Sequence, residues 1–287
     1  MTIPERLTIP KLIERKGEGR RITMVSTYDT PTARLVDEAG IDILLVGDSL
    51  AMVVLGRENT LSVTMDEMIH HTRAVARARR RALLVADMPF LSYHISRRQG
   101  IRNAGRLVQE AGADAVKVEG GRERAAAIQA IVDAEIPVMG HVGLNPQAVQ
   151  RLGGFKIQGR TLEHAESILR DAEALQQAGV FALVLEAIPE ELGRLITHSV
   201  KVPTIGIGAG RHCDGQVLVF HDLIGLEERQ KPRFVRRYAC LRDPILEALS
   251  AFRREVEAGH FPSDEEVYTL RPEVARALAS RHGESSQ

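Results

Sequence analysis

The sequence predicts an α/β protein with a (β/α)8 or TIM-barrel fold, and three observations support this prediction. The chain has 287 residues, close to the roughly 250 that such a barrel occupies as one domain. Short apolar runs alternate with amphipathic segments, as expected for parallel strands that are buried on both faces. Seven of these runs end at a polar residue, an ionisable residue or a glycine-rich turn. Because all the strands of a parallel barrel point the same way, these ends would meet at one mouth.

The predicted strands recur along the chain at the spacing of successive barrel units. Seven of them cover residues 22–27, 43–47, 82–87, 114–119, 137–143, 181–186 and 203–210. An eighth, at residues 216–222, follows the seventh so closely that only a short helix or an irregular loop fits between them. A doubly wound open sheet is therefore the alternative fold.

Amphipathic helices are predicted between these strands, at residues 31–40, 101–112, 122–135 and 166–179. Three of them end in an Ala-Gly pair, at Gly40, Gly112 and Gly179, where glycine permits the left-handed stop of a helix. The connections at residues 50–66 and 144–161 are longer, and long loops at a barrel mouth commonly form lids or substrate walls. The second of them carries glycines and cations that suit either an anion-contacting segment or a plain surface loop. Residues 232–259 are predicted to be helical.

Composition restricts the domain organisation and the class of protein. We expect one catalytic barrel domain at residues 1–262 and a partly disordered tail at residues 263–287. Lys plus Arg equal Asp plus Glu, 38 each, so neither nucleic acid nor an anionic membrane is an expected partner. Two cysteines, Cys213 and Cys240, have no metal-type spacing and give no disulfide framework. The first residues lack the apolar core of a signal peptide, so a cytoplasmic location is expected.

Two aspartates, Asp48 and Asp87, follow directly on the second and third apolar runs, with Ser49 beside the first. Buried like charges on neighbouring strands require a counter-charge, and Mg²⁺ typically takes one or two protein carboxylates. An aspartate at the end of a strand can also cap the next helix. The pair on adjacent strands favours a metal site over two separate caps.

Lys117 and Glu119 lie two residues apart on the fourth run, so both side chains would point to the same side. They could form only a buried ion pair. Near a metal, Lys117 could instead bind a carboxylate or enolate oxygen, and Glu119 could orient a metal-bound water. His141 ends the fifth run after a glycine, where a structural histidine and a substrate contact are equally plausible.

Glu186 ends the sixth run and is followed by apolar residues. Such surroundings raise the pKa of a carboxyl group toward the working range of a general base, although a helix cap is an alternative role. The glycines from Gly206 to Gly210 stand where many barrels bind phosphate, and close backbone packing would explain them equally well. A metal, a base and a lysine together predict removal of a proton beside the carbonyl of a 2-oxo acid, followed by attack of the enolate on an electrophile.

The strings VGDSL, ADMPF, KVEGG, GHVGLNPQ, GGFKIQGR and LVLEAIP, in this order and spacing, resemble the ketopantoate hydroxymethyltransferase family. The resemblance covers roughly residues 2–262. It implies a barrel of the phosphoenolpyruvate/pyruvate superfamily that transfers a one-carbon unit from 5,10-methylenetetrahydrofolate to 3-methyl-2-oxobutanoate. The product is 2-dehydropantoate, a precursor of pantothenate and coenzyme A.

The resemblance also implies roles for individual residues. Asp48 and Asp87 would be metal ligands, and Glu119 would support the metal through water. Ser49 and Lys117 would contact the substrate, together with the two aspartates; His141 would lie in the same pocket, and Glu186 would be the general base. Family members are decamers of two pentameric rings, so a homodecamer is expected. Ala51 and the SVT at residues 62–64 depart from the usual family pattern, outside these positions.

Two rival functions are consistent with the residues alone. A metal-dependent aldolase or lyase of the same superfamily would share the enolate chemistry without needing folate. A non-catalytic barrel that binds a 2-oxo acid would not need Glu186 opposite the metal.

Overall fold

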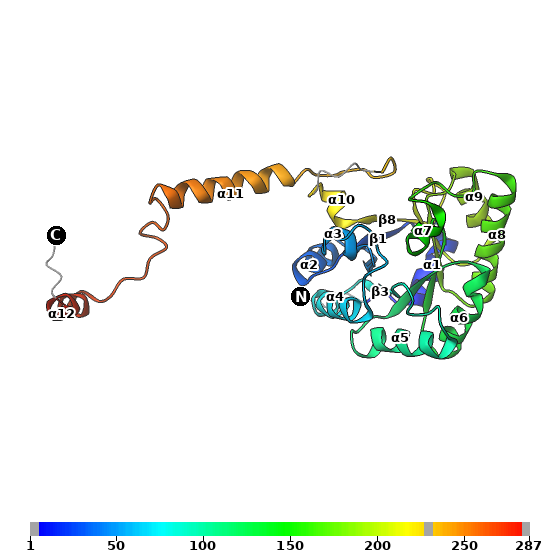
Figure 1. The fold of residues 1–287 in the computed structure, drawn as a ribbon, viewed down its shortest axis with the longest axis horizontal. Coiled ribbons are helices and arrows are strands. Elements are labelled where there is room, and N and C mark those ends of the chain that lie inside the picture. The colour runs from blue at the N-terminus through cyan, green and yellow to red at the C-terminus, as the bar shows by residue number, and fades with distance from the viewer. Residues whose placement is uncertain (1–5, 227–231, 283–287) are drawn as a thin grey trace. The chain divides into compact units, whose positions relative to one another are not determined.

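The computed structural model describes residues 6–226 and 232–282, and in these ranges the strands β1 to β8 form one closed parallel barrel (Figure 1). Closure occurs between β1 and β8, which pair in parallel from Ile22↔Gly215 to Ser26↔Val219. The predicted barrel is therefore confirmed, and the alternative open sheet is wrong. The strands are β1 (Ile22–Ser26), β2 (Ile43–Val46), β3 (Leu83–Asp87), β4 (Ala115–Glu119), β5 (Val138–Gly143), β6 (Ala182–Glu186), β7 (Thr204–Ile207) and β8 (Gly215–Val219).

Helices follow the first six strands and form the outer layer. They are α2 (Thr30–Glu38), α4 (Met65–Ala78), α5 (Arg97–Gln109), α6 (Arg122–Asp133), α8 (Leu162–Gln177) and α9 (Glu190–Ser199). Side-chain oxygens accept hydrogen bonds from the first turns of four of these helices, at Asp29, Thr64, Ser96 and Thr161. The predicted helix stops are confirmed, because Gly40, Gly112 and Gly179 have φ of +81°, +78° and +88°.

The eighth unit differs from the prediction. Strand β8 ends at Val219, where its pairing with β1 also ends, and the short helix α10 (Phe220–Ile224) begins inside the predicted strand at residues 216–222. The two long connections also contain short helices. Helix α3 (Leu50–Val53) lies in the first; the 3-10 helix η1 (Pro146–Ala148) and α7 (Val149–Leu152) lie in the second.

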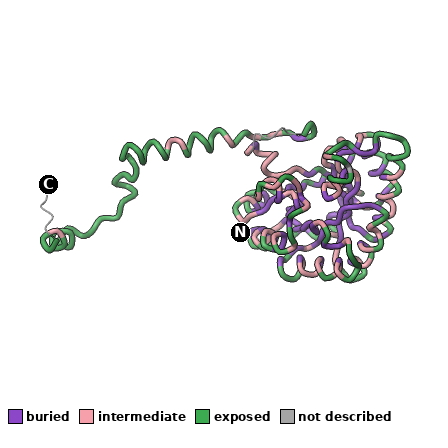
Figure 2. The backbone as a smooth tube through the Cα atoms, viewed as in Figure 1, coloured by how far each residue is buried: buried purple, intermediate pink, exposed green. Residues whose placement is uncertain are grey.

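The alternation of side chains along the strands creates two apolar layers. Residues such as Leu83, Val85, Ala115, Met139 and Val184 form one buried cluster inside the barrel. The alternate residues join a larger cluster between the strands and the helices. Figure 2 shows the result, with the strands of the barrel buried and the outer faces of the surrounding helices exposed.

Helix α1 (Ile9–Glu18) lies at the N-terminal ends of the strands, opposite the mouth. Its Arg15 forms a buried ion pair with Asp42, which precedes β2, at 2.7 Å. Its Lys16 pairs with Asp214, which precedes β8, at 2.8 Å. The helix thus ties two strands together at the end of the barrel away from the predicted site.

The chain divides into two compact units, residues 1–238 and 239–287. The second contains α11 (Arg242–Glu257) and α12 (Pro272–His282), so the helix predicted at residues 232–259 begins only at Arg242. The division precedes the predicted end of the catalytic domain at residue 262. Partial disorder in the tail stays a prediction, and residues 283–287 lie outside the described ranges. Among the described helices, none combines the length with the apolar composition that a membrane span requires.

Candidate active site

The strand alternation places five predicted site residues on the inner face of the barrel, at its C-terminal mouth. Four of them lie two residues after an apolar residue of the interior cluster on the same strand. These four are Asp87 after Val85, Lys117 after Ala115, His141 after Met139 and Glu186 after Val184. Glu119 lies two residues after Lys117 and so faces the same side. The strand register sets them side by side. Asp87 is the partner of Lys117, and Glu119 is the partner of His141.

Lys117 lies at the centre of this group, and its side chain is 5% exposed. Its Nζ is 3.0 Å from Asp87 Oδ1, 3.4 Å from His141 Nδ1 and 3.8 Å from Glu119 Oε1. Burial alone would lower the pKa of Lys117, but the charges of Asp87, Glu119 and Asp48 raise it. The lysine is therefore a fixed positive charge among carboxylates.

His141 connects the lysine with Glu186. Its Nδ1 is 3.6 Å from Glu119 Oε1, and its Nε2 is 3.2 Å from Glu186 Oε2. Burial and the charge of Lys117 would lower the pKa of His141, but Glu119 and Glu186 raise it to about 9. Glu186 is the more accessible partner, since its side chain is 17% exposed whereas that of His141 is 2% exposed.

Asp48 and Ser49 reach the same site from the end of β2. The backbone N–H of Asp48 donates to Asp87 Oδ2 at 3.0 Å, which holds the two aspartates together. The hydroxyl groups of Ser49 and Tyr28 are 2.8 Å apart. All seven sequence-predicted site residues therefore lie in one connected cluster, which we call the carboxylate cluster: Asp48, Ser49, Asp87, Lys117, Glu119, His141 and Glu186.

The electrostatics of this cluster suit an added cation. Burial, followed by the charges of Glu119 and Asp87, raises the pKa of Asp48 well above its usual value. Burial also raises the pKa of Asp87. Burial opposes ionisation of Glu119 as well, but His141 and Lys117 lower its pKa. Carboxylates whose pKa rises in this way are short of positive charge, and a divalent ion would supply it.

The donor set fits a magnesium site with few protein ligands. Within the described ranges, no three His, Cys, Asp or Glu side chains are arranged to hold a metal. Mg²⁺ is usually held by only one or two carboxylates, with water and substrate completing its shell. The buried Glu119 Oε1 accepts no hydrogen bond from any described residue, so this oxygen could accept one from a water on the metal. Asp48 and Asp87 could therefore hold the ion, with Glu119 beside it.

Gln147 is a buried member of the site that the sequence analysis did not single out. Its backbone N–H donates to Glu119 Oε2 at 3.0 Å, and its side-chain Nε2 donates to Asp48 Oδ2 at 2.9 Å. Its Oε1 accepts a hydrogen bond from Tyr93 Oη at 2.7 Å. The quoted string GHVGLNPQ contained this residue, but an uncharged glutamine in a loop gave no chemical signal.

The glycines from Gly206 to Gly210 serve packing, which was one of their two predicted roles. A Cβ at Gly206 would lie 2.9 Å from Cys213 Sγ, and one at Gly210 would lie 2.6 Å from the Cβ of Glu190. Gly208 and Gly210 also have φ of +67° and +81°. The short turn after β7 requires these glycines whether or not a ligand binds there.

Comparison with known proteins points to one family. The family model described as ketopantoate hydroxymethyltransferase matches residues 6–264. A relative from Syntrophomonas wolfei, named 3-methyl-2-oxobutanoate hydroxymethyltransferase, is 55% identical over 273 residues, which are 95% of this chain and 99% of that protein. A relative of the same name from Moorella thermoacetica is 57% identical over 263 residues, covering 92% of this chain and 98% of its own.

Solved structures of distant proteins share the fold. A phosphonopyruvate hydrolase in complex with oxalate and Mg²⁺ aligns with a TM-score of 0.61 at 15% identity, over 97% of this chain and 100% of that one. A 2,3-dimethylmalate lyase, a member of the PEP mutase/isocitrate lyase superfamily, aligns with a TM-score of 0.56 at 14% identity, over 96% of this chain and 99% of that one. At such identities the likeness concerns the barrel alone.

Proposed function

The chain belongs to the ketopantoate hydroxymethyltransferase family, and we propose how the residues of its carboxylate cluster carry out the transfer. The enzyme transfers a hydroxymethyl group to 3-methyl-2-oxobutanoate and forms 2-dehydropantoate, a step of pantothenate biosynthesis. The family uses a methylene-folate as the one-carbon donor. A folate-independent aldolase or lyase and a binding-only barrel are not favoured by these comparisons.

Glu186 is the general base in this proposal. It removes the single C3 proton of 3-methyl-2-oxobutanoate, and it is the most accessible carboxylate of the ionisable groups in the cluster. His141, 3.2 Å from the carboxylate, holds it in position. A general base must be held within hydrogen-bond reach of the proton that it removes. The contact with His141 restricts the Glu186 carboxylate in this way.

Lys117 holds the negative charge that develops on the substrate. Its ammonium group is buried between Asp87, His141 and Glu119, and a buried cation interacts more strongly with an enolate than one in water does. Ser49 contacts the substrate from the end of β2. The C3 carbon then forms its new bond to the methylene carbon of the folate as the bond from that carbon to N10 breaks, and N10 takes the proton that Glu186 removed. Water then displaces N5 from the same carbon, which supplies the hydroxyl of the product and a proton to N5, and tetrahydrofolate is released.

A divalent cation such as Mg²⁺, held by Asp48 and Asp87 with Glu119 supporting it through water, would polarise the keto group and balance the charge of the carboxylates. The observation that carries the proposal is the continuous series of contacts from Asp87 through Lys117 and His141 to Glu186. In this series the Lys117 ammonium group lies at Nδ1 of the His141 ring, and the accessible Glu186 carboxylate lies at Nε2 of the same ring.

Proton NMR of 3-methyl-2-oxobutanoate in D₂O tests this mechanism. With protein and Mg²⁺, and with or without tetrahydrofolate, we expect the C3 proton signal to disappear as deuterium replaces it. The Glu186→Gln variant should exchange at least 100-fold more slowly, since general-base catalysis contributes roughly 10²–10⁴-fold.

Glu191→Gln is the matched control for this experiment. Glu191 is exposed in the first turn of α9, five positions after Glu186, and its substitution should leave the exchange rate unchanged. Exchange by the Glu186→Gln variant at the wild-type rate would assign the base to another residue. Absence of exchange in folded wild-type protein with Mg²⁺ would contradict the mechanism itself.

A homodecameric assembly and a cytoplasmic location complete the proposal. Both follow from the family resemblance and the composition of the chain.

A further inference from the structure

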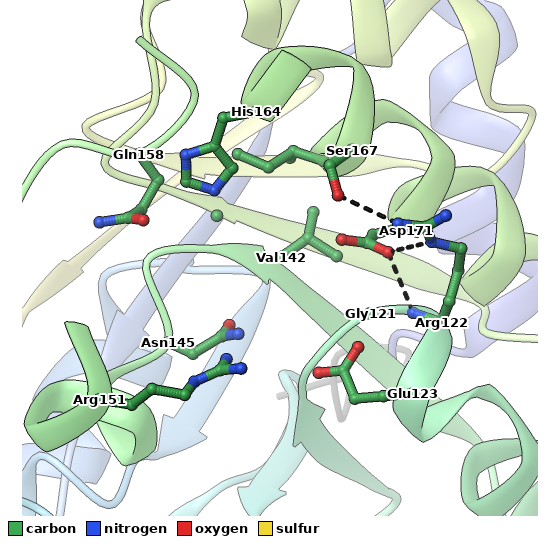
Figure 3. A pocket seen from close by; sticks show the side chains of 12 residues that line it. Gly121, Arg122, Glu123, Val142, Asn145, Arg151, Gln158, His164, Ser167 and Asp171 are labelled. Carbon is green, nitrogen blue, oxygen red and sulfur yellow. Dashed lines mark hydrogen bonds and ion pairs between the residues drawn. The ribbon is translucent and has the colours of Figure 1, made fainter. Parts of the chain in front are cut away.

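Two adjoining cavities open at the mouth of the barrel beside the carboxylate cluster. The first, which we call the polar cavity, has a volume of about 460 Å³ and lies between the first turns of α6 and α8 (Figure 3). The second, which we call the aromatic cavity, has a volume of about 350 Å³ and includes Glu119 and Gln147 in its wall. Glu123, Asn145 and Arg151 line both, so the cavities meet at these residues.

Three aromatic rings line one part of the aromatic cavity. Phe90, Tyr93 and His94 come from the loop after β3, and the His94 ring centroid is 4.1 Å from that of Tyr93 and 5.3 Å from that of Phe90. Burial and the charge of Arg124 lower the pKa of His94 to about 4, so this ring is neutral at pH 7. Its Nδ1 is buried and has no hydrogen-bond partner among the described residues. These rings suit a bicyclic ligand with a planar heteroaromatic half that can also hydrogen-bond.

The polar cavity has a different chemistry. In Figure 3 the side chains of Arg151 and Asn145 lie on one side of it, and Glu123 lies across from them, on the same side as Arg122 and Asp171. Arg122 is held by Asp171 at 2.7 Å. Arg151, in contrast, makes no ion pair with any residue that the structure describes, and the buried Oδ1 of Asn145 has no described hydrogen-bond donor. An unpaired guanidinium at the junction suits a carboxylate ligand.

The shape of the one-carbon donor matches this pair of cavities. In a methylenetetrahydrofolate the reactive carbon lies between a bicyclic pterin and an aminobenzoyl-glutamate tail. The two parts must therefore extend in different directions from a carbon that reaches the carboxylate cluster. We propose that the pterin ring binds in the aromatic cavity against His94 and Phe90, and that the glutamate tail crosses the junction to pair with Arg151. This inference rests on the proposed function, because it takes the folate donor from there.

Equilibrium binding of two ligands to the full-length protein, measured by calorimetry without oxygen, tests the assignment. Tetrahydrofolate carries the glutamate, and tetrahydropteroate lacks it. Arg151→Met should weaken tetrahydrofolate about tenfold, as expected for one charge-assisted hydrogen bond, and leave tetrahydropteroate unchanged. Arg160→Met is the matched control, since Arg160 is exposed in the same connection and lines neither cavity; it should change neither affinity.

The ring position is tested with His94→Ala, which should weaken both ligands by the same factor. Wild-type affinity for both ligands in the two variants would overturn the assignment, and so would an equal loss for both ligands in Arg151→Met. Failure of the proposed function gives a different result from failure of this assignment, because it affects the wild-type protein. The wild-type protein would then neither exchange the C3 proton of 3-methyl-2-oxobutanoate nor bind tetrahydrofolate.

Discussion

Gln147 shows how one uncharged residue can fix the geometry of a charged site. Its main-chain and side-chain amides donate to Glu119, the last residue of β4, and to Asp48, which follows β2, and Tyr93 fixes its orientation. A second bond from Nε2 to the backbone carbonyl of Met88 uses its remaining donor. Each polar atom of the amide is thus satisfied, and the glutamine positions two carboxylates.

Replacing Gln147 with leucine tests this role. The variant keeps the side-chain volume but removes the donor to Asp48 Oδ2 and to the carbonyl oxygen of Met88, whereas Tyr93 Oη keeps its bond to the carbonyl oxygen of Glu119. We therefore expect destabilisation of about 1–3 kcal/mol. Activity should fall more than stability explains, with weaker Mg²⁺ dependence; kinetics at several Mg²⁺ concentrations and urea unfolding would measure both. Gln177→Leu, at an exposed position of α8 that lines neither cavity, is the control. An unchanged Mg²⁺ half-saturation would show that the glutamine has only a structural role.

At the scale of elements, the first turn of α4 anchors the long connection that follows β2. Thr64 and Glu67 form a reciprocal capping box, and Arg57 Nη1 donates to Glu67 Oε2 at 3.0 Å. Hydrogen bonds from Arg57, and then from Thr64, lower the pKa of Glu67 to about 2. One carboxylate therefore joins the start of a barrel helix to a loop at the mouth.

The pH dependence of this anchor follows from the sign of the pKa shift. A carboxyl group whose pKa is lower in the folded state stabilises the protein above its unfolded pKa of about 4.3, and this contribution is lost as the pH falls toward 2. Wild type should therefore exceed Glu67→Gln by about 1 kcal/mol in unfolding free energy at pH 7, and the difference should shrink between pH 4.5 and pH 2. Urea unfolding across this range measures it. Glu58→Gln, an exposed change in the same loop, should have no effect; a difference for Glu67→Gln that persists at pH 2 would contradict the argument.

At the scale of the whole molecule, the ion pairs of helix α1 stabilise the end of the barrel that lies away from the carboxylate cluster. Its ion pairs with Asp42 and Asp214 lie at the N-terminal ends of the strands, whereas the carboxylate cluster lies at the C-terminal ends. Both side chains of the Arg15–Asp42 pair are less than 10% exposed. Burial opposes ionisation of Asp42, but Arg15 and Thr23 lower its pKa. The ionised form of the buried Asp42 therefore depends on Arg15 for part of its stabilisation.

Arg15→Met should destabilise the barrel without altering its chemistry. Removing one partner of a buried pair leaves an uncompensated charge and costs about 3–5 kcal/mol. We expect a value near the lower limit, because Thr23 still donates to Asp42 Oδ2 and Arg81 still lies 3.6 Å from Asp42 Oδ1. Unfolding in urea at one fixed protein concentration measures the loss, and kcat/KM below the transition should match wild type. Arg20→Met, exposed just after the same helix, should change stability by less than about 0.5 kcal/mol. A large fall in kcat/KM for folded Arg15→Met would show that the two ends of the barrel are coupled.

Most of the barrel and the charged part of the site could be predicted because the signals are local. Apolar runs mark the strands, and a period of two residues places Lys117 and Glu119 on the same face. The eighth unit was the weakest, since one short strand and a five-residue helix α10 leave little periodicity to read. Gln147 was missed because its role depends on partners rather than on its own chemistry.

The positions of the strands along the chain and the residues at the strand ends follow from the sequence itself, because they need only the preferences of neighbouring residues. Closure between β1 and β8, the bond between Gln147 and Asp48 across 99 positions, and the contacts of α1 with Asp42 and Asp214 emerge only in the tertiary structure. So does the meeting of the two cavities at Arg151. These features join segments far apart in sequence, and their geometry is set by packing that no local pattern encodes.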